Sequence, residues 1–161
     1  YYSKSFTLPA PDFAQIDFFF LDAERMFYGD AEQLVWLDKG LENSTADWKI
    51  VVGHRPLFSY GYHGFNGPLI PRLQPILNHR ADIYIAGHEH DMQLLGPMND
   101  VYYIVTGSAG AAKVTGVEDL TVFAAGRAGF MGFLISKDKL VLRAIETNAG
   151  VIYTKILKTK N

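Results

Sequence analysis

The sequence predicts an α/β fold in which parallel strands are followed by an antiparallel meander. Between residues 16 and 86, short apolar runs alternate with segments of helical spacing, which is typical of a parallel sheet with right-handed crossovers. Between residues 130 and 157, apolar runs are separated only by tight turns, and such turns join antiparallel neighbours. A length of 161 residues suffices for one core, so we expect residues 1–161 to form a single domain or a fragment of one.

The first two predicted strands lie near the amino terminus. Residues 2–8 alternate between apolar and polar side chains and end in a turn at residues 9–12. Residues 16–21 are almost continuously apolar, which indicates a strand covered on both faces. Asp22 follows that strand, and we expect it to serve as a turn or cap residue.

The next segments supply the helices and the central strands. Asp30 is a candidate N-cap with Gln33 three residues on, as in a capping box, and the helix should end near residue 43. We expect strands at 48–53 and 81–86, with a helix at 70–79 between them. Residues 57–68, rich in glycine and tyrosine, should form an irregular loop at the end of a sheet strand, where functional groups often lie.

The remaining chain should complete the sheet and form the meander. Residues 101–106 read as another strand, and residues 111–129 show no clear period, so we expect an irregular connection with a helical turn there. The meander should consist of strands at 130–136, 139–147 and 151–157.

Composition excludes several classes of function. Fifteen Lys and Arg against 17 Asp and Glu give a net charge of −2, which predicts neither a nucleic-acid surface nor a polybasic membrane patch. No apolar run reaches the length of a membrane span. The chain has no cysteine, so it can form neither a disulfide nor a thiolate metal site.

Two similar motifs dominate the sequence. Residues 48–54 form an apolar run that ends in Gly53-His54, and residues 83–90 form a second run that ends in Gly-His-Glu-His. Parallel strands end at one edge of a sheet, where ligands bind in open α/β folds. The two motifs would therefore bring His54, His88 and His90 to one rim, and imidazole is the commonest protein metal ligand.

A single histidine at a strand end is more often a surface residue than a ligand, and the paired occurrence is what favours a metal site. Glu89, between the two later histidines, should point elsewhere and is not expected to be a ligand.

The quoted residues resemble the calcineurin-like metallophosphoesterases, and most closely the purple, or tartrate-resistant, acid phosphatase branch. The resemblance rests on residues 51–56 (Val-Val-Gly-His-Arg-Pro) and 84–93 (Tyr-Ile-Ala-Gly-His-Glu-His-Asp-Met-Gln). It extends to residues 103–110 and to the helix at 31–37. The resemblance implies the carboxyl-terminal half of a metallophosphoesterase-type β-sandwich flanked by helices.

The resemblance also implies a function. It indicates a binuclear phosphohydrolase that cleaves phosphomonoesters by attack of a metal-bound hydroxide. By the family pattern, His54 and His88 would bind a divalent ion (Fe, Zn or Mn), and His90 would bind the second ion, which is iron in the purple enzymes. His63 would contact the substrate phosphate or protonate the leaving group, although a plain surface histidine fits its loop position equally well.

This sequence departs from the family in its carboxylates. The family's Gly-Asp-x-Gly, Gly-Asp-x-x-Tyr and Gly-Asn-His motifs are not found in it, and Gly29-Asp30 is a poor match. We therefore expect a fragment whose partner is the amino-terminal half of the same protein, or a degenerate relative. The 161-residue chain alone should be inactive. Family resemblance suggests secretion or a lysosomal or vacuolar location.

Two alternatives remain open at this stage. The protein could be an inactive scaffold or binding protein that kept the phosphatase fold, or a phosphodiesterase of the same superfamily that acts on nucleotides. Ligand motifs upstream in the full-length protein would favour the enzyme, and hydrolysis of a cyclic nucleotide would favour the phosphodiesterase.

Overall fold

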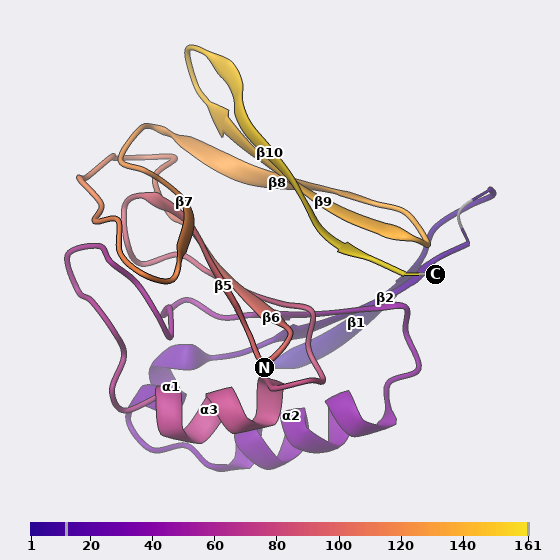
Figure 1. The fold of residues 1–161 in the computed structure, drawn as a ribbon. Helices are drawn as coiled ribbons and strands as arrows, with labels where there is room; N and C mark the ends of the chain where they lie inside the picture. The colour runs from indigo at the N-terminus through magenta and orange to yellow at the C-terminus, as the bar shows by residue number, and fades with distance from the viewer. Residues whose placement is uncertain (12, 161) are drawn as a thin grey trace.

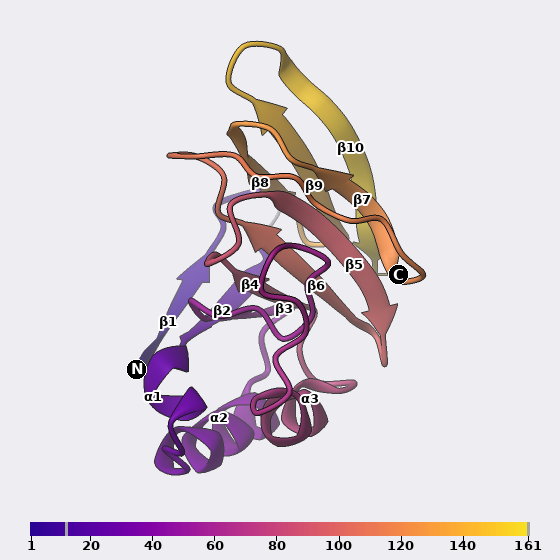
Figure 2. The same cartoon turned by 90° about the vertical axis from the view of Figure 1, so that its left-hand side faces the viewer.

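The computed structural model describes residues 1–11 and 13–160, and it contains two sheets and three helices in these residues. The larger sheet has seven strands in the order β1-β2-β3-β4-β6-β5-β7, and the smaller has three in the order β10-β9-β8. The helices cover one face of the larger sheet, and the smaller sheet lies against the other face (Figures 1 and 2). The predicted α/β fold with a terminal meander is confirmed.

The first half of the chain builds three of the four strands in the parallel part of the larger sheet. Its elements, in chain order, are β1 (Tyr2–Thr7), β2 (Gln15–Phe20), α1 (Ala23–Phe27), α2 (Glu32–Asn43), β3 (Trp48–Val52), α3 (Ile70–Leu77) and β4 (Ile83–Ala86). Strands β2, β3 and β4 pair in parallel, and β1 forms an antiparallel edge hairpin with β2. Asp12, in the turn expected at residues 9–12, lies outside the described residues.

The second half completes both sheets. It contains β5 (Met92–Met98), β6 (Val101–Thr106), β7 (Thr121–Ala125), β8 (Gly129–Ile135), β9 (Lys139–Glu146) and β10 (Gly150–Thr159). Strand β6 pairs in parallel with β4, whereas β5 runs antiparallel to both β6 and β7. The meander of β8, β9 and β10 forms the smaller sheet.

Strand alternation divides the core into two layers. Val51, Tyr84 and Tyr103 face the helices, whereas their neighbours Ile50 and Ile83 face the smaller sheet. Because successive strand residues point to opposite faces, continuously apolar strands are what a sheet covered on both sides requires. The parallel strands are therefore packed on both faces, and the loops with the histidines start from their carboxyl ends.

The helix starts differ in detail from the sequence prediction. Asp22 caps α1 by accepting a hydrogen bond from the Arg25 backbone N–H at 3.0 Å, which confirms it as a cap residue. The N-cap position of α2 is Ala31 rather than the expected Asp30, although the Asp30 carboxylate accepts a hydrogen bond from the Glu32 N–H. Gln33 is buried and bonds to the backbone of Asp22, so it ties α2 to the end of β2.

The expectation of an irregular connection over residues 111–129 was wrong in part, because β7 lies within it. This strand is half-buried along its whole length and sits at the sheet edge. Its short Thr-Val-Phe-Ala-Ala sequence has no alternation, and pairing with β5 is what makes it a strand.

No helix in the described part of the chain has the length and apolar character needed to cross a bilayer.

The packing of the two sheets generates a stability prediction. Leu94 in β5 is fully buried between the sheets, whereas Leu134 in β8 is 49% exposed. We expect Leu94→Ala to lower the free energy of unfolding by about 2–5 kcal/mol, because it leaves a cavity between the sheets. Leu134→Ala, the matched control, should cost about 1 kcal/mol or less. Urea denaturation of both variants measures this difference, and equal losses would contradict the layer assignment.

Candidate metal centre

His54 and His88 meet at the carboxyl edge of the parallel sheet. Each follows the glycine that comes directly after its strand, β3 or β4, and the two strands are parallel neighbours. The backbone continues the pairing beyond the strands, since the Gly53 N–H donates to the Ile85 carbonyl and the Gly87 N–H donates to the His54 carbonyl. The imidazoles meet with Nδ1 of His88 3.1 Å from Nε2 of His54, and their ring planes are nearly perpendicular.

This separation fits two ligands of one ion. Two nitrogens bound to an ion at about 2.0–2.1 Å stand roughly 2.9–3.4 Å apart when the bond angle lies between about 90° and 109°. The observed 3.1 Å falls in that range. The pair would supply two nitrogen ligands to one ion, so further ligands are needed for a complete site.

His88 is held in an uncommon backbone conformation. Its φ is +67°, in the left-handed region that a residue with a side chain seldom adopts. Such strain persists only where the surrounding structure enforces it. Gly107 permits close packing here, because a Cβ at that position would collide with the Glu89 carbonyl oxygen. The loop after β6 therefore packs directly against the backbone that carries His88.

Burial and neighbouring positive groups favour the neutral form of His88. Burial lowers the pKa of its imidazole, and the nearby His63 and Arg55 lower it further. Neutral imidazole is the form that binds metal ions. Arg55 is itself paired through two hydrogen bonds to the Glu24 carboxylate, at 2.6 and 2.9 Å, and its guanidinium lies over the Phe27 ring.

His63 joins the pair from the loop between β3 and α3. Its ring centroid lies 4.4 Å from that of His88, and its side chain is 45% exposed. A pocket of about 240 Å³ opens beside it, lined by both histidines together with Arg55, Phe27 and Phe65 among others. A second pocket of about 350 Å³ lies by His54, over the ends of β3 and β4.

His90 is not brought into this group. Its side chain is exposed, and in residues 1–11 and 13–160 no hydrogen bond or ring contact joins its imidazole to the other three histidines. Its backbone carbonyl accepts a hydrogen bond from the Lys113 N–H. Within the same residues, no three His, Cys, Asp or Glu side chains are grouped so that they could hold a metal ion.

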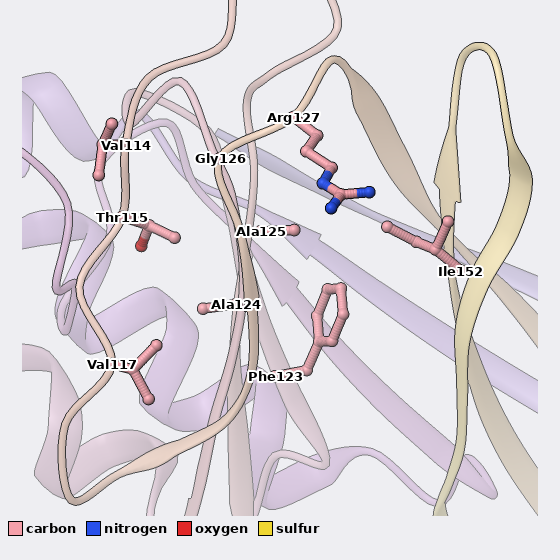
Figure 3. Close-up of a pocket in the computed structure, with 9 residues that line it drawn as sticks. All are labelled: Val114, Thr115, Val117, Phe123, Ala124, Ala125, Gly126, Arg127 and Ile152. Atoms are coloured by element: carbon pink, nitrogen blue, oxygen red, sulfur yellow. The ribbon is translucent and has the colours of Figure 1, made fainter.

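A cleft larger than these two pockets lies elsewhere. It has a volume of about 470 Å³ and opens between the loop at Val114–Val117, strand β7 and Ile152 of β10 (Figure 3). Its lining is mostly apolar, and its one charged side chain, Arg127, pairs with Glu146 at 3.0 Å. Of the described residues, none that lines this cleft is a histidine or a carboxylate.

The sequence pattern indicated the histidines but not the buried polar side chains near them. Glu89, Asp91 and Gln93 are all buried, and we call them the buried polar row. They occupy alternate positions in the sequence, and their side chains converge: Gln93 donates a hydrogen bond to the Asp91 carboxylate, and a Cβ at Gly61 would meet both the Glu89 and the Asp91 carboxylates. Gln93 accepts a hydrogen bond from the Tyr60 N–H and donates to the Ser59 hydroxyl, and Glu89 contacts His63. The alternation Glu-x-Asp-x-Gln was the available signal. The Glu89 carboxylate contacts His63, through its backbone N–H at 2.7 Å and near its ring nitrogen Nδ1 at 3.2 Å.

Comparison with known proteins identifies related sequences. Residues 3–92 match the family model described as calcineurin-like phosphoesterase. The chain is 36% identical over 77 residues to tartrate-resistant acid phosphatase type 5 of Oryctolagus cuniculus, a match that covers 47% of this chain and 24% of that protein. It is 29% identical over 131 residues to purple acid phosphatase 7 of Arabidopsis thaliana, covering 78% of this chain and 40% of that protein.

A solved structure extends the likeness to the whole fold. The structure described as "GAP50 the anchor in the inner membrane complex of Plasmodium" superimposes with a TM-score of 0.79 at 27% sequence identity. The superposition covers 99% of this chain and 54% of that one. The chain thus spans less than half the length of the two curated relatives and about half of the solved structure.

Two glycines after β6 test the support of His88. A Cβ at Gly107 would overlap the Glu89 carbonyl, whereas nothing lies within 4 Å of a Cβ at Gly110. We expect Gly107→Ala to destabilise the fold by about 1–3 kcal/mol, because backbone must shift against backbone. Gly110→Ala should change stability by about 0.5 kcal/mol or less. Chemical denaturation of the two variants gives the comparison, and a neutral Gly107→Ala would show that the loop does not brace the residues around His88.

Proposed function

Because this chain belongs to the calcineurin-like phosphoesterase family, we propose that it forms part of a metal-dependent phosphohydrolase site that acts on phosphomonoesters. The observation that carries the proposal is the pair of imidazoles at the sheet edge, with 3.1 Å between Nδ1 of His88 and Nε2 of His54. The relatives named as tartrate-resistant and purple acid phosphatases support the choice of phosphomonoesters.

The proposed roles follow from the position of each group. His54 and His88 would hold one ion, and His90 would contribute to a second. When bound, the ions would supply Lewis-acid stabilisation of the phosphate and a nucleophile derived from water. His63 would face the phosphate or its leaving group, since it lines the 240 Å³ pocket beside His88.

The same pocket suits a leaving group with an apolar part. Phe27, Phe65 and two prolines contribute to its wall, and the Arg55 charge there is already balanced by Glu24. The pocket therefore offers apolar contact without an unbalanced positive charge.

The carboxylate ligands are the missing part of this proposal. In the described residues no carboxylate joins His54 and His88 in a group of three potential ligands, and the family motifs that carry such ligands are not found in this sequence. We propose that a further segment of the same protein supplies them, which accords with the greater length of the curated relatives.

A second candidate function is that of a phosphatase-fold scaffold. The likeness to the Plasmodium protein described as an anchor favours it, because that likeness covers 99% of this chain. Among residues 1–11 and 13–160, the lack of a carboxylate grouped with His54 and His88 as a third ligand points the same way. The two functions differ in metal binding and in hydrolysis of a simple aryl phosphate by the full-length protein.

Substitution of the paired histidines tests the enzyme proposal. In the full-length protein, we expect His54→Ala and His88→Ala each to weaken Zn²⁺ binding by more than about a hundredfold. Loss of a residue that supports a metal ligand lowers metal affinity by about 10–100-fold, and loss of the ligand itself should lower it further. Hydrolysis of an aryl phosphate should fall in parallel.

His79→Ala provides the control. His79 is exposed after α3 and pairs with Asp100, so its loss should leave both quantities unchanged. Titration calorimetry and a phosphatase assay make the measurements. A full-length protein that folds cooperatively but neither binds Zn²⁺ nor hydrolyses aryl phosphates would overturn the enzyme proposal in favour of the scaffold.

A further inference from the structure

Glu89 lies between two proposed metal ligands, yet its side chain turns inward. It is 2% exposed, and its carboxylate reaches the loop between β3 and α3. The oxygen Oε1 accepts a hydrogen bond from the backbone N–H of His63 at 2.7 Å. The same oxygen stands 3.2 Å from Nδ1 of the His63 imidazole. One carboxylate oxygen therefore contacts both the main chain and the ring of a single residue.

A carboxylate at this depth is costly unless hydrogen bonds and charge partners compensate for its lost hydration. His63 is the compensating residue for Oε1. The other oxygen, Oε2, faces Gly61, where a Cβ would come within 2.7 Å of it. The loop backbone thus closes over the carboxylate, and the absence of a side chain at position 61 permits this close approach.

The rest of the buried polar row fixes the loop that carries His63. The Gln93 side chain accepts from the Tyr60 N–H at 2.8 Å and donates to the Ser59 hydroxyl at 2.9 Å. That hydroxyl in turn accepts from the Gly61 N–H at 2.9 Å. Hydrogen bonds therefore hold the loop at residues 59, 60, 61 and 63. They fix the position of His63, although its ring is half exposed.

We infer that Glu89 is a positioning residue that selects which nitrogen of His63 meets the substrate. At 3.2 Å, the carboxylate charge favours a hydrogen on Nδ1 over a lone pair there, which leaves Nε2 as the nitrogen free to meet the substrate. A histidine that hydrogen-bonds through one ring nitrogen has its tautomer and orientation fixed at the other. The inference rests on the proposed function only in naming a phosphate ester as the group that Nε2 meets.

The tautomer of His63 tests this directly and needs neither metal nor activity. We would label the full-length protein with ¹⁵N at its histidine rings, remove metal, and record spectra at a pH of about 9, where histidine is neutral. The His63 signals would be assigned from their loss in His63→Gln. We expect the wild-type ring to carry its hydrogen on Nδ1 and the Glu89→Ala ring to carry it mainly on Nε2.

Hydrogen exchange of the His63 backbone amide provides a second readout. It should accelerate by about tenfold or more in Glu89→Ala, because the amide loses a charged acceptor. Glu89→Gln keeps one acceptor oxygen and the same volume, so it should fold normally and show an intermediate change. Glu42→Ala removes an exposed carboxylate from α2 and should change neither readout.

Kinetics connect the tautomer to the reaction. In the active protein, Glu89→Ala should lower kcat by about tenfold to a hundredfold with little change in KM, since a misplaced group affects the chemical step. A wild-type His63 with its hydrogen on Nε2, or a tautomer unchanged in Glu89→Ala, would overturn the inference. If the tautomer shifts as expected but the wild-type protein hydrolyses no phosphate ester, the positioning stands and the proposed function fails.

Discussion

The parallel pairing of β3 with β4 is the constraint on which the proposed site depends. It brings Val52 beside Ile85 and so places the glycines that end the two strands at one sheet edge. His54 and His88 follow those glycines, and their nitrogens meet at 3.1 Å without a long connecting loop. An antiparallel arrangement of the same strands would separate the two imidazoles by the length of a strand. Cores on both faces of the sheet keep this edge in place.

This sheet edge combines buried strands with exposed histidine side chains. The strands beneath it are buried, whereas His54 and His63 are exposed to the pockets around them. The buried polar row joins the two parts, since it begins between the histidines and ends under the loop that carries His63. Two segments about thirty residues apart in the chain are thereby fixed relative to each other by side-chain hydrogen bonds. Such fixed relative positions are what a site for phosphate transfer requires.

The sequence predicted the layers and the meeting of His54 with His88 because both follow from local patterns. Continuous apolar runs mark buried parallel strands, and a glycine and a histidine at each strand end mark the rim. The role of Glu89 could not be read in the same way, because its partner lies 26 residues away in an irregular loop. Strand β7 was missed for a related reason, since its pairing with β5, and not its own composition, makes it a strand. The positive φ of His88 and the exposed position of His90 depend on loop geometry that no periodicity encodes.

The central claim is that His54 and His88 bind one ion together, and X-ray absorption spectroscopy of the Zn²⁺-loaded full-length protein tests it most directly. The account predicts imidazole nitrogens at about 2.0–2.1 Å from zinc. The number of imidazoles on zinc should fall in a protein that carries both His54→Ala and His88→Ala. A zinc environment without imidazole, or one that is identical in the wild type and the double variant, would contradict the account.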